Sequence, residues 1–587
     1  MKDQNNRPFS ILFPYHEDTV YRQLTPAACH DLGIDTLCRT LTDDQKEQRL
    51  ITDVLSNMTS DRRVAEYRSS VFADILRLPQ LRKSMTGLFE KIEFIRDFGS
   101  MHRESDENLG LWRLLHRLDE LNDYIKCVEA IREGLDGLDI RSDGLKGFKA
   151  YVDELYSEAC FAEMKKDIAD LKMKASDIKS VTLGVNVNER FEAVSMGLIS
   201  VNSKPFRKSG IVSNFADAVA AKNRIHDSTD WDGSMHYQYV DSETDQSTFE
   251  FFEKMVGLSS IQKAPFVDRR IVSTIVNAPE GDGVANSTFY LERVLNRILD
   301  SLVKKLRETL TKYANIAIVN ISQLIPEFVY YIRFAEFIEK YRSMGFVFCE
   351  PSVAGEGDIP MKARGFYNLK LALGTADMSS IVCNDLDFDR EHTVYILTGA
   401  NRGGKTTVTQ AVGLLFALAQ GGISVPASSF EYIPADCIYT HFPADEDKTM
   451  DLGRLGEECV RFREIYTACT GESLLLLNET FSTTSFEEGF YIAKDSVRAL
   501  LKKQVRTIYN THMHKLAADM DGTDGDGNGV CAASLIVRCD DGRRSFRLEN
   551  APPEGMSYAG DIARKYGVTY DMLINGQEGA GDTAEMS

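Results

Sequence analysis

The sequence predicts a multidomain protein in which α-helical segments surround a strand-rich insertion and precede an α/β domain built around a phosphate-binding loop. Three observations lead to this fold class. Apolar residues recur at helical spacing up to about residue 175. Short pieces rich in Val, Asn and Gly follow from about residue 180. From about residue 346, short apolar strands alternate with helices, as in a parallel sheet covered by helices.

Length and composition indicate a soluble, cytoplasmic protein. The 587 residues are enough for about two to four domains. With 68 basic and 88 acidic residues the net charge is −20, which argues against nonspecific coating of nucleic acid but leaves room for a local basic groove. The 11 cysteines have no paired or zinc-type spacing, which favours reduced thiols in a cytosol. The sequence has no secretory signal and no run of about 18 apolar residues, so no membrane partner is expected.

The first helical segments are predicted over residues 1–175. The stripe of Leu50, Ile51, Val54 and Leu55 indicates one helix, and Ser60 or Asp61 is expected to cap the next. Residues 176–285 form the strand-rich insertion.

A long amphipathic helix is expected in residues 286–345. Its apolar positions are Leu291, Leu295, Ile298, Leu302, Leu306 and Leu310. The pattern fits a lever or coiled coil and a core helix of an all-α domain equally well. The α/β domain is then predicted over 346–575, with a hairpin turning at Asp541-Gly542, and 576–587 is expected to be disordered.

Residues 399–406, GANRGGKT, fit the phosphate-loop pattern G-x-x-x-x-G-K-[ST] at every fixed position. A strand is predicted before the loop and a helix after it, as this motif requires. Backbone N–H groups of such a loop surround phosphate oxygens. Lys405 can then reach the β and γ phosphates, and the Thr406 hydroxyl can bind Mg²⁺.

Polar residues follow two further apolar strands. Asn478 and Glu479 end the first, where a carboxylate can activate the water that attacks a γ-phosphate. Ser485 starts a predicted capping box with Glu488, and its hydroxyl could face a phosphate or be an ordinary cap. His512 ends the second strand, where a histidine can sense the γ-phosphate.

The order of these motifs resembles the MutS family of DNA mismatch-repair ATPases. The family pattern TGPN-x-GGK-[ST]-T is matched by TGANRGGKTT at 398–407. Its DE-x-x-x-GTS-x-x-x-G is matched by Asn478-Glu479, Thr484-Ser485 and Gly489. Its THxxEL is matched by THMHKL at 511–516. The resemblance is strongest over 346–575, and the shorter upstream region is similar to a member without the amino-terminal mismatch-recognition domain.

The resemblance implies a helical core and lever, a clamp-like insertion and an ABC-type ATPase domain. It implies a homodimer that binds ATP and Mg²⁺ at the subunit interface, hydrolyses ATP, and closes a clamp on DNA. The implied site residues are catalytic Glu479 and His512, metal ligands Thr406 and Asn478, and nucleotide-binding Gly399, Asn401, Gly403, Gly404, Lys405, Thr406, Thr407, Ile381 and Ser485.

The sequence departs from the family at several of these positions. Ala400 replaces the usual Pro. Asn478 replaces the usual Asp, so weaker metal binding and slow hydrolysis are expected. Ile381 lies where an aromatic residue often stacks on adenine. Gly453, Arg454 and Glu457 stand where the family carries a Ser-Thr element that reaches the partner subunit's γ-phosphate, and Arg454 could supply charge there.

Two hypotheses about the partner therefore stay open. The first is structured or mismatched DNA, with Lys204, Arg207 and Lys208 as candidate phosphate contacts or, equally, a solvated basic turn. The second is an ATP-driven clamp or scaffold that acts on a protein, with slow or no hydrolysis. The acidic loop at Asp524, Asp526 and Asn528 resembles the start of a calcium loop, but Leu535 stands where a Glu is required, so no calcium site is expected.

Overall fold

The computed structural model describes residues 9–14, 16–88, 111–176, 180–187, 189–190, 193–202, 276–277, 300–313, 318–355, 360–375, 377–400, 403–443, 453–523, 529–540, 543–553, 564 and 566–574. The chain divides into two compact units. One comprises Met1–Lys83, Gly137–Phe148 and Gln323–Ser587, and the other comprises Ser84–Asp136 and Lys149–Ser322. Each unit thus combines segments that are separate in the sequence, whereas each predicted domain is one continuous segment.

A six-stranded sheet forms the centre of the first unit. In spatial order its strands are β11 (Ile438–His441), β12 (Leu474–Asn478), β13 (Arg506–Asn510), β9 (His392–Gly399), β14 (Cys531–Asp540) and β15 (Arg543–Asn550). The first five are parallel, and β15 pairs antiparallel with β14 as the predicted hairpin requires. The parallel order brings the carboxyl ends of β9, β12 and β13 to one edge, where ligands bind in open α/β sheets.

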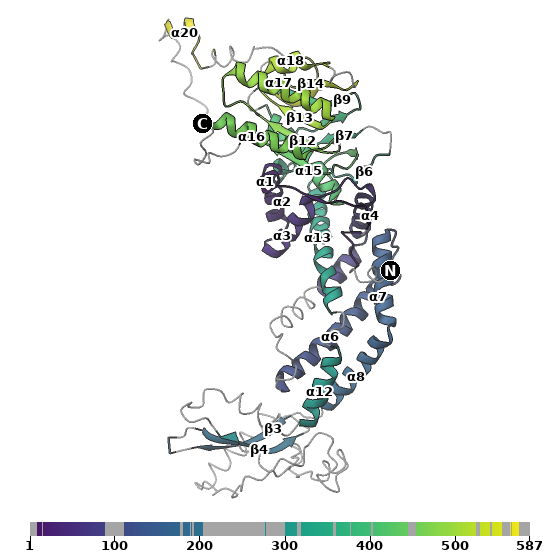
Figure 1. Cartoon of the computed structure of the whole chain (residues 1–587). Coiled ribbons are helices and arrows are strands. Elements are labelled where there is room, and N and C mark those ends of the chain that lie inside the picture. Colours follow the sequence, from purple (N-terminus) through teal and green to yellow (C-terminus); the bar gives the residue numbers. More distant parts are fainter. Residues whose placement is uncertain are drawn as a thin grey trace. The chain divides into compact units, whose positions relative to one another are not determined.

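Helices cover both faces of this sheet (Figure 1). The long helix α15 (Lys405–Gln420) lies on one face, while α17 (Phe486–Lys503) and α18 (His514–Met520) lie on the other. Helix α16 (Gly453–Ala468) packs beside β11. Alternate leucines of β12 face opposite layers, since Leu475 and Leu477 belong to the apolar cluster with α17 and α18, whereas Leu476 contacts α15 at Gly413.

A smaller mixed sheet lies beside the amino-terminal end of α15. Its order is β6 (Ser352–Val353), β10 (Ser429–Tyr432), β7 (Met361–Phe366) and β8 (Asn384–Phe388), with α14 (Leu369–Leu373) and the 3₁₀ turn η3 (Met378–Ser380) between β7 and β8. The Asn384 side chain links β8 to β15, because it accepts from the Leu548 N–H at 2.8 Å and donates to the Phe546 carbonyl at 3.2 Å.

Four helices from the start of the chain also belong to the first unit. They are α1 (Pro26–Leu32), α2 (Ile34–Leu41), α3 (Gln45–Ser56) and α4 (Arg62–Arg77), and β1 (Arg22–Gln23) pairs antiparallel with β2 (Asn57–Met58). The side chains of Thr25, Asp44 and Asp61 cap α1, α3 and α4. Of the two residues that the sequence allowed as the cap of α4, Ser60 and Asp61, the structure has Asp61. Helices α1, α3 and α4 pack on α15, which explains why the first 83 residues join the unit that contains the six-stranded sheet.

Buried hydrogen bonds hold the carboxyl end of α15. Arg68 of α4 is 1% exposed and donates from Nη1 to the Gln420 carbonyl at 2.9 Å. The Tyr330 hydroxyl, from α13 (Ile318–Ser343), donates to the Gly421 carbonyl at 2.9 Å. The Gln420 amide donates to the Thr59 carbonyl at 2.8 Å. The first two bonds satisfy carbonyls that the helix end leaves free, and the third ties the Gln420 side chain to the segment before α4.

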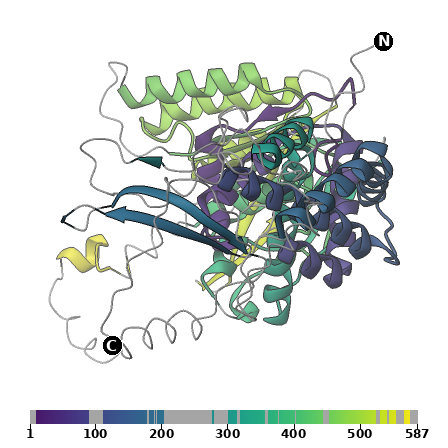
Figure 2. The same cartoon turned by 90° about the horizontal axis from the view of Figure 1, so that it is seen from below.

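The second unit contains a helical group and a separate sheet. Helices α6 (Leu111–Leu135), α8 (Ala159–Ser176) and α12 (Asp300–Tyr313) pack together around buried apolar residues that include Leu118, Ile168 and Leu306. Strands β3 (Ser180–Val187) and β4 (Ala193–Asn202) pair antiparallel, visible as two neighbouring blue arrows in Figure 2, and β5 (Val276–Asn277) adds to β4. Helices α7 (Asp143–Ser157) and α13 contribute residues to both units, and a short helix α20 (Tyr570–Ile574) closes the described chain.

Several sequence predictions can be compared with these elements. Leu302, Leu306 and Leu310 lie on α12 as expected, while 291–299 lie outside the described residues. The candidate DNA contacts Lys204, Arg207 and Lys208, the acidic loop at 524–528, the turn at 541–542 and the tail at 576–587 also lie outside them. Among the described helices, none combines the length and apolar character needed to cross a membrane.

Candidate functional site

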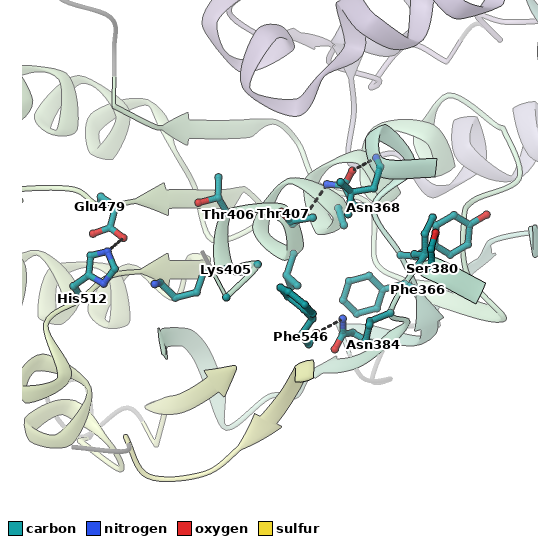
Figure 3. A pocket seen from close by; sticks show the side chains of 18 residues that line it. Phe366, Asn368, Ser380, Asn384, Lys405, Thr406, Thr407, Glu479, His512 and Phe546 are labelled. Carbon is teal, nitrogen blue, oxygen red and sulfur yellow. Dashed lines mark hydrogen bonds and ion pairs between the residues drawn. The ribbon is translucent and has the colours of Figure 1, made fainter. Parts of the chain in front are cut away.

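A cavity of about 520 Å³ lies where β9 ends and α15 begins. Figure 3 shows Glu479, His512 and Lys405 at one end of it and Phe366, Ser380, Asn384 and Phe546 at the other. The lining residues come from the phosphate loop and α15, from the smaller sheet with α14, η3 and the connection after η3, from the segments after β12 and β13, and from β15: Phe366, Tyr367, Asn368, Leu371, Ser380, Ile381, Val382, Asn384, Gly403, Gly404, Lys405, Thr406, Thr407, Val408, Ala411, Glu479, His512 and Phe546.

Two glycines of the phosphate loop, Gly399 and Gly404, have positive φ angles. Gly404 caps α15 with φ 93°, a left-handed conformation that side chains disfavour. Gly399 has φ 140°, and a Cβ there would lie 3.1 Å from the Val537 carbonyl oxygen. The Lys405 side chain is buried and its ammonium donates to the Gly399 carbonyl at 3.1 Å. The loop and the start of the helix together form an anion site.

The electrostatics of Lys405 follow from its place in the loop. Burial lowers the pKa of the Lys405 ammonium below its usual range, and the nearby Glu479 carboxylate opposes that shift. A bound polyphosphate would bring further negative charge to the same ammonium, which favours its protonated form.

Three polar side chains meet beside the first turn of α15. The Thr406 hydroxyl donates to the Asn478 side-chain oxygen at 3.0 Å. The Asn510 amide also donates to that oxygen, and it lies 3.3 Å from the Thr406 hydroxyl. Register explains the meeting, because Asn478 and Asn510 are partners across β12 and β13. The buried Asn510 oxygen has no hydrogen-bond partner in the described structure.

Oxygen atoms are the ligands that a small hard cation prefers, but the oxygens of Thr406 and Asn478 carry no negative charge. Thr406 and Asn478 offer neutral oxygens, and Mg²⁺ in such sites also takes phosphate oxygens and water. The residues therefore fit Mg²⁺ held jointly with a nucleotide. The uncharged Asn478 supplies less attraction than a carboxylate would.

Glu479 and His512 form an ion pair at the polar end of the cavity. The distance from Glu479 Oε1 to His512 Nε2 is 2.9 Å. Both residues follow the carboxyl ends of neighbouring parallel strands, β12 and β13, which is why they meet. Glu479 has φ 54°, so its backbone is held in a region that non-glycine residues rarely occupy.

The other end of the cavity is apolar and includes aromatic residues that the sequence reasoning did not identify, Tyr367 among them. Ile381 lines this end. Phe366 of β7 and Phe546 of β15 line it as well. Phe546 has φ 57°, and its ring edge lies 3.2 Å from where a Cβ on Gly404 would stand. The positive φ of an aromatic residue in a strand carries no sequence signal.

The remaining predicted residues lie as follows. Gly403, Gly404, Lys405, Thr406 and Thr407 line the cavity, and the Thr407 carbonyl accepts from Asn368 at 2.7 Å. Ser485 caps α17 as predicted, accepting from the Glu488 N–H at 3.4 Å, and does not line this cavity. Asn401 and the Arg454 side chain lie outside the described residues.

A parallel sheet with a phosphate loop after β9 and an acid after β12, with β13 between these two strands, defines the class of P-loop nucleotide-binding folds. Within that class, residues 395–537 match the family model for MutS domain V, and residues 60–344 match the model for the MutS2 N-terminal domain. The predicted resemblance to the MutS family is therefore confirmed.

Individual relatives are similar over about a third of the chain. It is 29% identical over 192 residues to a protein named endonuclease MutS2 from Thermus thermophilus, covering 33% of this chain and 25% of the relative. It is 31% identical over 207 residues to DNA mismatch repair protein MutS 2 from Halobacterium salinarum, covering 34% of this chain and 23% of the relative. For DNA mismatch repair protein MutS from Desulfovibrio desulfuricans the identity is 27% over 224 residues, covering 38% of this chain and 23% of the relative. The similar part thus spans about a quarter of each relative's length.

Proposed function

We propose that this protein binds ATP with Mg²⁺ in the described cavity, hydrolyses it, and uses the cycle to act on DNA. The observation that carries the proposal is the make-up of one continuous cavity. A phosphate loop and an acid–histidine pair lie at one end and an apolar, aromatic-lined space lies at the other. A nucleoside triphosphate would place its phosphates at the polar end and its base at the apolar end.

In this proposal the polyphosphate lies on the loop backbone and on the start of α15, and Lys405 moves from the Gly399 carbonyl to the phosphates. Thr406 and Asn478 hold Mg²⁺, which when bound neutralises charge on the phosphate oxygens. Glu479 accepts a proton from the attacking water, and His512 orients the Glu479 carboxylate through the 2.9 Å contact. The base lies among Ile381, Phe366 and Phe546.

Two variants test the nucleotide part. Lys405→Ala should remove most binding of a fluorescent ATP analogue. Glu479→Gln should keep that binding and lower turnover by roughly 10²–10⁴-fold, the usual contribution of a general base. Glu487→Gln is the matched control, because Glu487 is exposed on α17 and does not line the cavity. Unchanged turnover in Glu479→Gln would remove Glu479 from the base role.

The action on DNA rests on the match to MutS domain V and on similar proteins that are named for DNA mismatch repair. It is tested by fluorescence anisotropy with duplex, mismatched and four-way DNA at 50 and 200 mM salt, with and without ATP. Phosphate contacts by basic residues should make the affinity fall steeply between the two salt concentrations. Absence of salt-sensitive binding to all three DNAs would contradict this part of the proposal.

We also propose that the protein works as a homodimer, with the start of α16 facing the partner's nucleotide. This follows from position in the chain, because Gly453 and Glu457 stand where the resembling family carries the element that reaches the partner subunit's nucleotide. Light scattering with and without a non-hydrolysable ATP analogue gives the oligomeric state. A monomer under both conditions would exclude the shared site.

A further inference from the structure

The turn that carries Glu479 has an unusual backbone. Glu479 has φ 54° and Phe481 has φ 62°, so two non-glycine residues lie in the left-handed region with Thr480 between them. The Ser482 N–H donates to the Glu479 carbonyl at 3.2 Å and closes the turn. Such a backbone persists only where its surroundings hold it.

Thr480 is the point at which the surrounding strands hold this turn. It is 1% exposed and does not line the cavity. Its hydroxyl lies 3.1 Å from Nδ1 of His441, at the end of β11. Its carbonyl accepts from the Tyr509 hydroxyl of β13 at 2.9 Å. The two contacts come from the strands on either side of β12, so they fix Thr480 from both directions.

The hydrogen bonds of His441 determine its role. Nε2 lies 3.3 Å from the Glu458 carbonyl, which can only accept, so Nε2 carries the proton. Nδ1 is then a bare acceptor, and the Thr480 hydroxyl donates to it. His441 is 3% exposed, so an apolar replacement of the threonine would leave a buried acceptor without a donor.

Further contacts hold the same turn without reaching the cavity. The Glu479 N–H donates to the Asn510 carbonyl at 2.9 Å. The Phe481 ring packs edge-on against Phe462 of α16, with centroids 5.4 Å apart. The Glu479 side chain projects from this fixed backbone toward His512.

We propose that Thr480, held by His441 and Tyr509, is a positioning residue that fixes the Glu479 carboxylate at the reacting end of the cavity. The proposal rests on the proposed function of Glu479 as general base. It predicts that loss of either hydrogen bond lowers the rate of the chemical step and leaves nucleotide affinity intact, because neither bond touches the phosphate loop.

The kinetic test uses two isosteric deletions, Thr480→Val and Tyr509→Phe, in the full chain. Each should lower kcat by about tenfold to a hundredfold, since misplacing a catalytic group by about 1 Å costs on that order, with the Kd for an ATP analogue within twofold of wild type. Thr480→Ser keeps the hydroxyl and should restore kcat to within about threefold.

Two matched controls separate positioning from loss of stability. Tyr330→Phe removes a buried 2.9 Å hydroxyl-to-carbonyl bond in another part of the fold. Thr507→Val removes a buried 2.9 Å bond from the Thr507 hydroxyl of β13 to the Val505 carbonyl just before that strand. Thermal unfolding of all variants should shift to a similar extent, while kcat falls only for the two deletions at the turn. Equal kcat losses in controls and turn variants would overturn the proposal.

A crystal structure of Thr480→Val decides the question independently of turnover. We expect the Glu479–His512 distance to lengthen from 2.9 Å and Glu479 to leave φ 54°. An unchanged turn and ion pair would overturn the positioning role. A wild-type protein that binds ATP without hydrolysing it would instead contradict the proposed function, while the crystal geometry would still test the inference.

Discussion

Replacing Gly489 by alanine should disturb the site through the turn that carries Glu479. A Cβ at Gly489 would lie 2.3 Å from the Phe481 carbonyl oxygen, and real Cβ atoms essentially never come within 3.0 Å of another heavy atom. The two must therefore separate by at least 0.7 Å, the difference between those distances. Gly489 lies in the first turn of α17, so the moving partner is the strained turn at 479–481.

The magnitude follows from two opposing effects. Alanine favours the helix over glycine by about 1 kcal/mol. Overpacking costs about 1–3 kcal/mol, so the free energy of unfolding should fall by about 1 kcal/mol in total. Because misplacement by about 1 Å can cost about a hundredfold in rate, kcat for ATP should fall about tenfold or more.

The assay is steady-state ATP hydrolysis together with urea unfolding and analogue binding. Gly471→Ala is the control, because its Cβ would meet the Lys503 carbonyl at 3.4 Å, an ordinary contact. It should leave kcat unchanged. Full turnover in Gly489→Ala, with a properly folded protein, would refute the argument that this glycine keeps the Glu479 turn in place.

Two further predictions concern charge. Asn478→Asp should tighten Mg²⁺-dependent binding of an ATP analogue at least tenfold, because both neighbours of the Asn478 oxygen, Thr406 and Asn510, are donors that suit a carboxylate; an unchanged Mg²⁺ titration would contradict this. Burial, reinforced by Arg461, lowers the pKa of His441 to about 4 from 6.5. The unfolded chain therefore binds a proton between these pH values that the folded chain does not, and the free energy of unfolding should fall by about 3 kcal/mol as pH drops through that window. His441→Gln should flatten this dependence in urea unfolding at pH 8 and 4.5, and an equally steep dependence in the variant would count against it.

The sequence predicted the parts of the site that are local in the chain. The phosphate loop, the strand before it and the helix after it lie within some 30 residues, and each has its own pattern of glycine, lysine and apolar residues. The same holds for Asn478 and Glu479 at a strand end and for the cap at Ser485. These features depend on propensity and spacing, which a single sequence records.

What the sequence did not predict depends on register and tertiary packing. Asn510 meets Asn478 only because β13 pairs with β12 in one register. Phe546 reaches the cavity from β15, more than a hundred residues after the phosphate loop, through a backbone conformation that its residue type disfavours. The periodicity of α1, α3 and α4 predicted helices with an apolar face, but periodicity does not specify that the face packs on α15.

The burial of α15 has a practical consequence for dissecting the chain. Of its 16 residues 13 are buried, and α1, α3 and α4 provide part of that cover. A fragment cut at residue 346, where the sequence suggests the nucleotide domain begins, would lose Arg68 and Tyr330 along with these helices. It would expose a broad apolar surface to water and would aggregate rather than fold. An expression design for the first unit should therefore include residues 9–83, 137–148 and 323–574, joined through linkers, because all three segments belong to it.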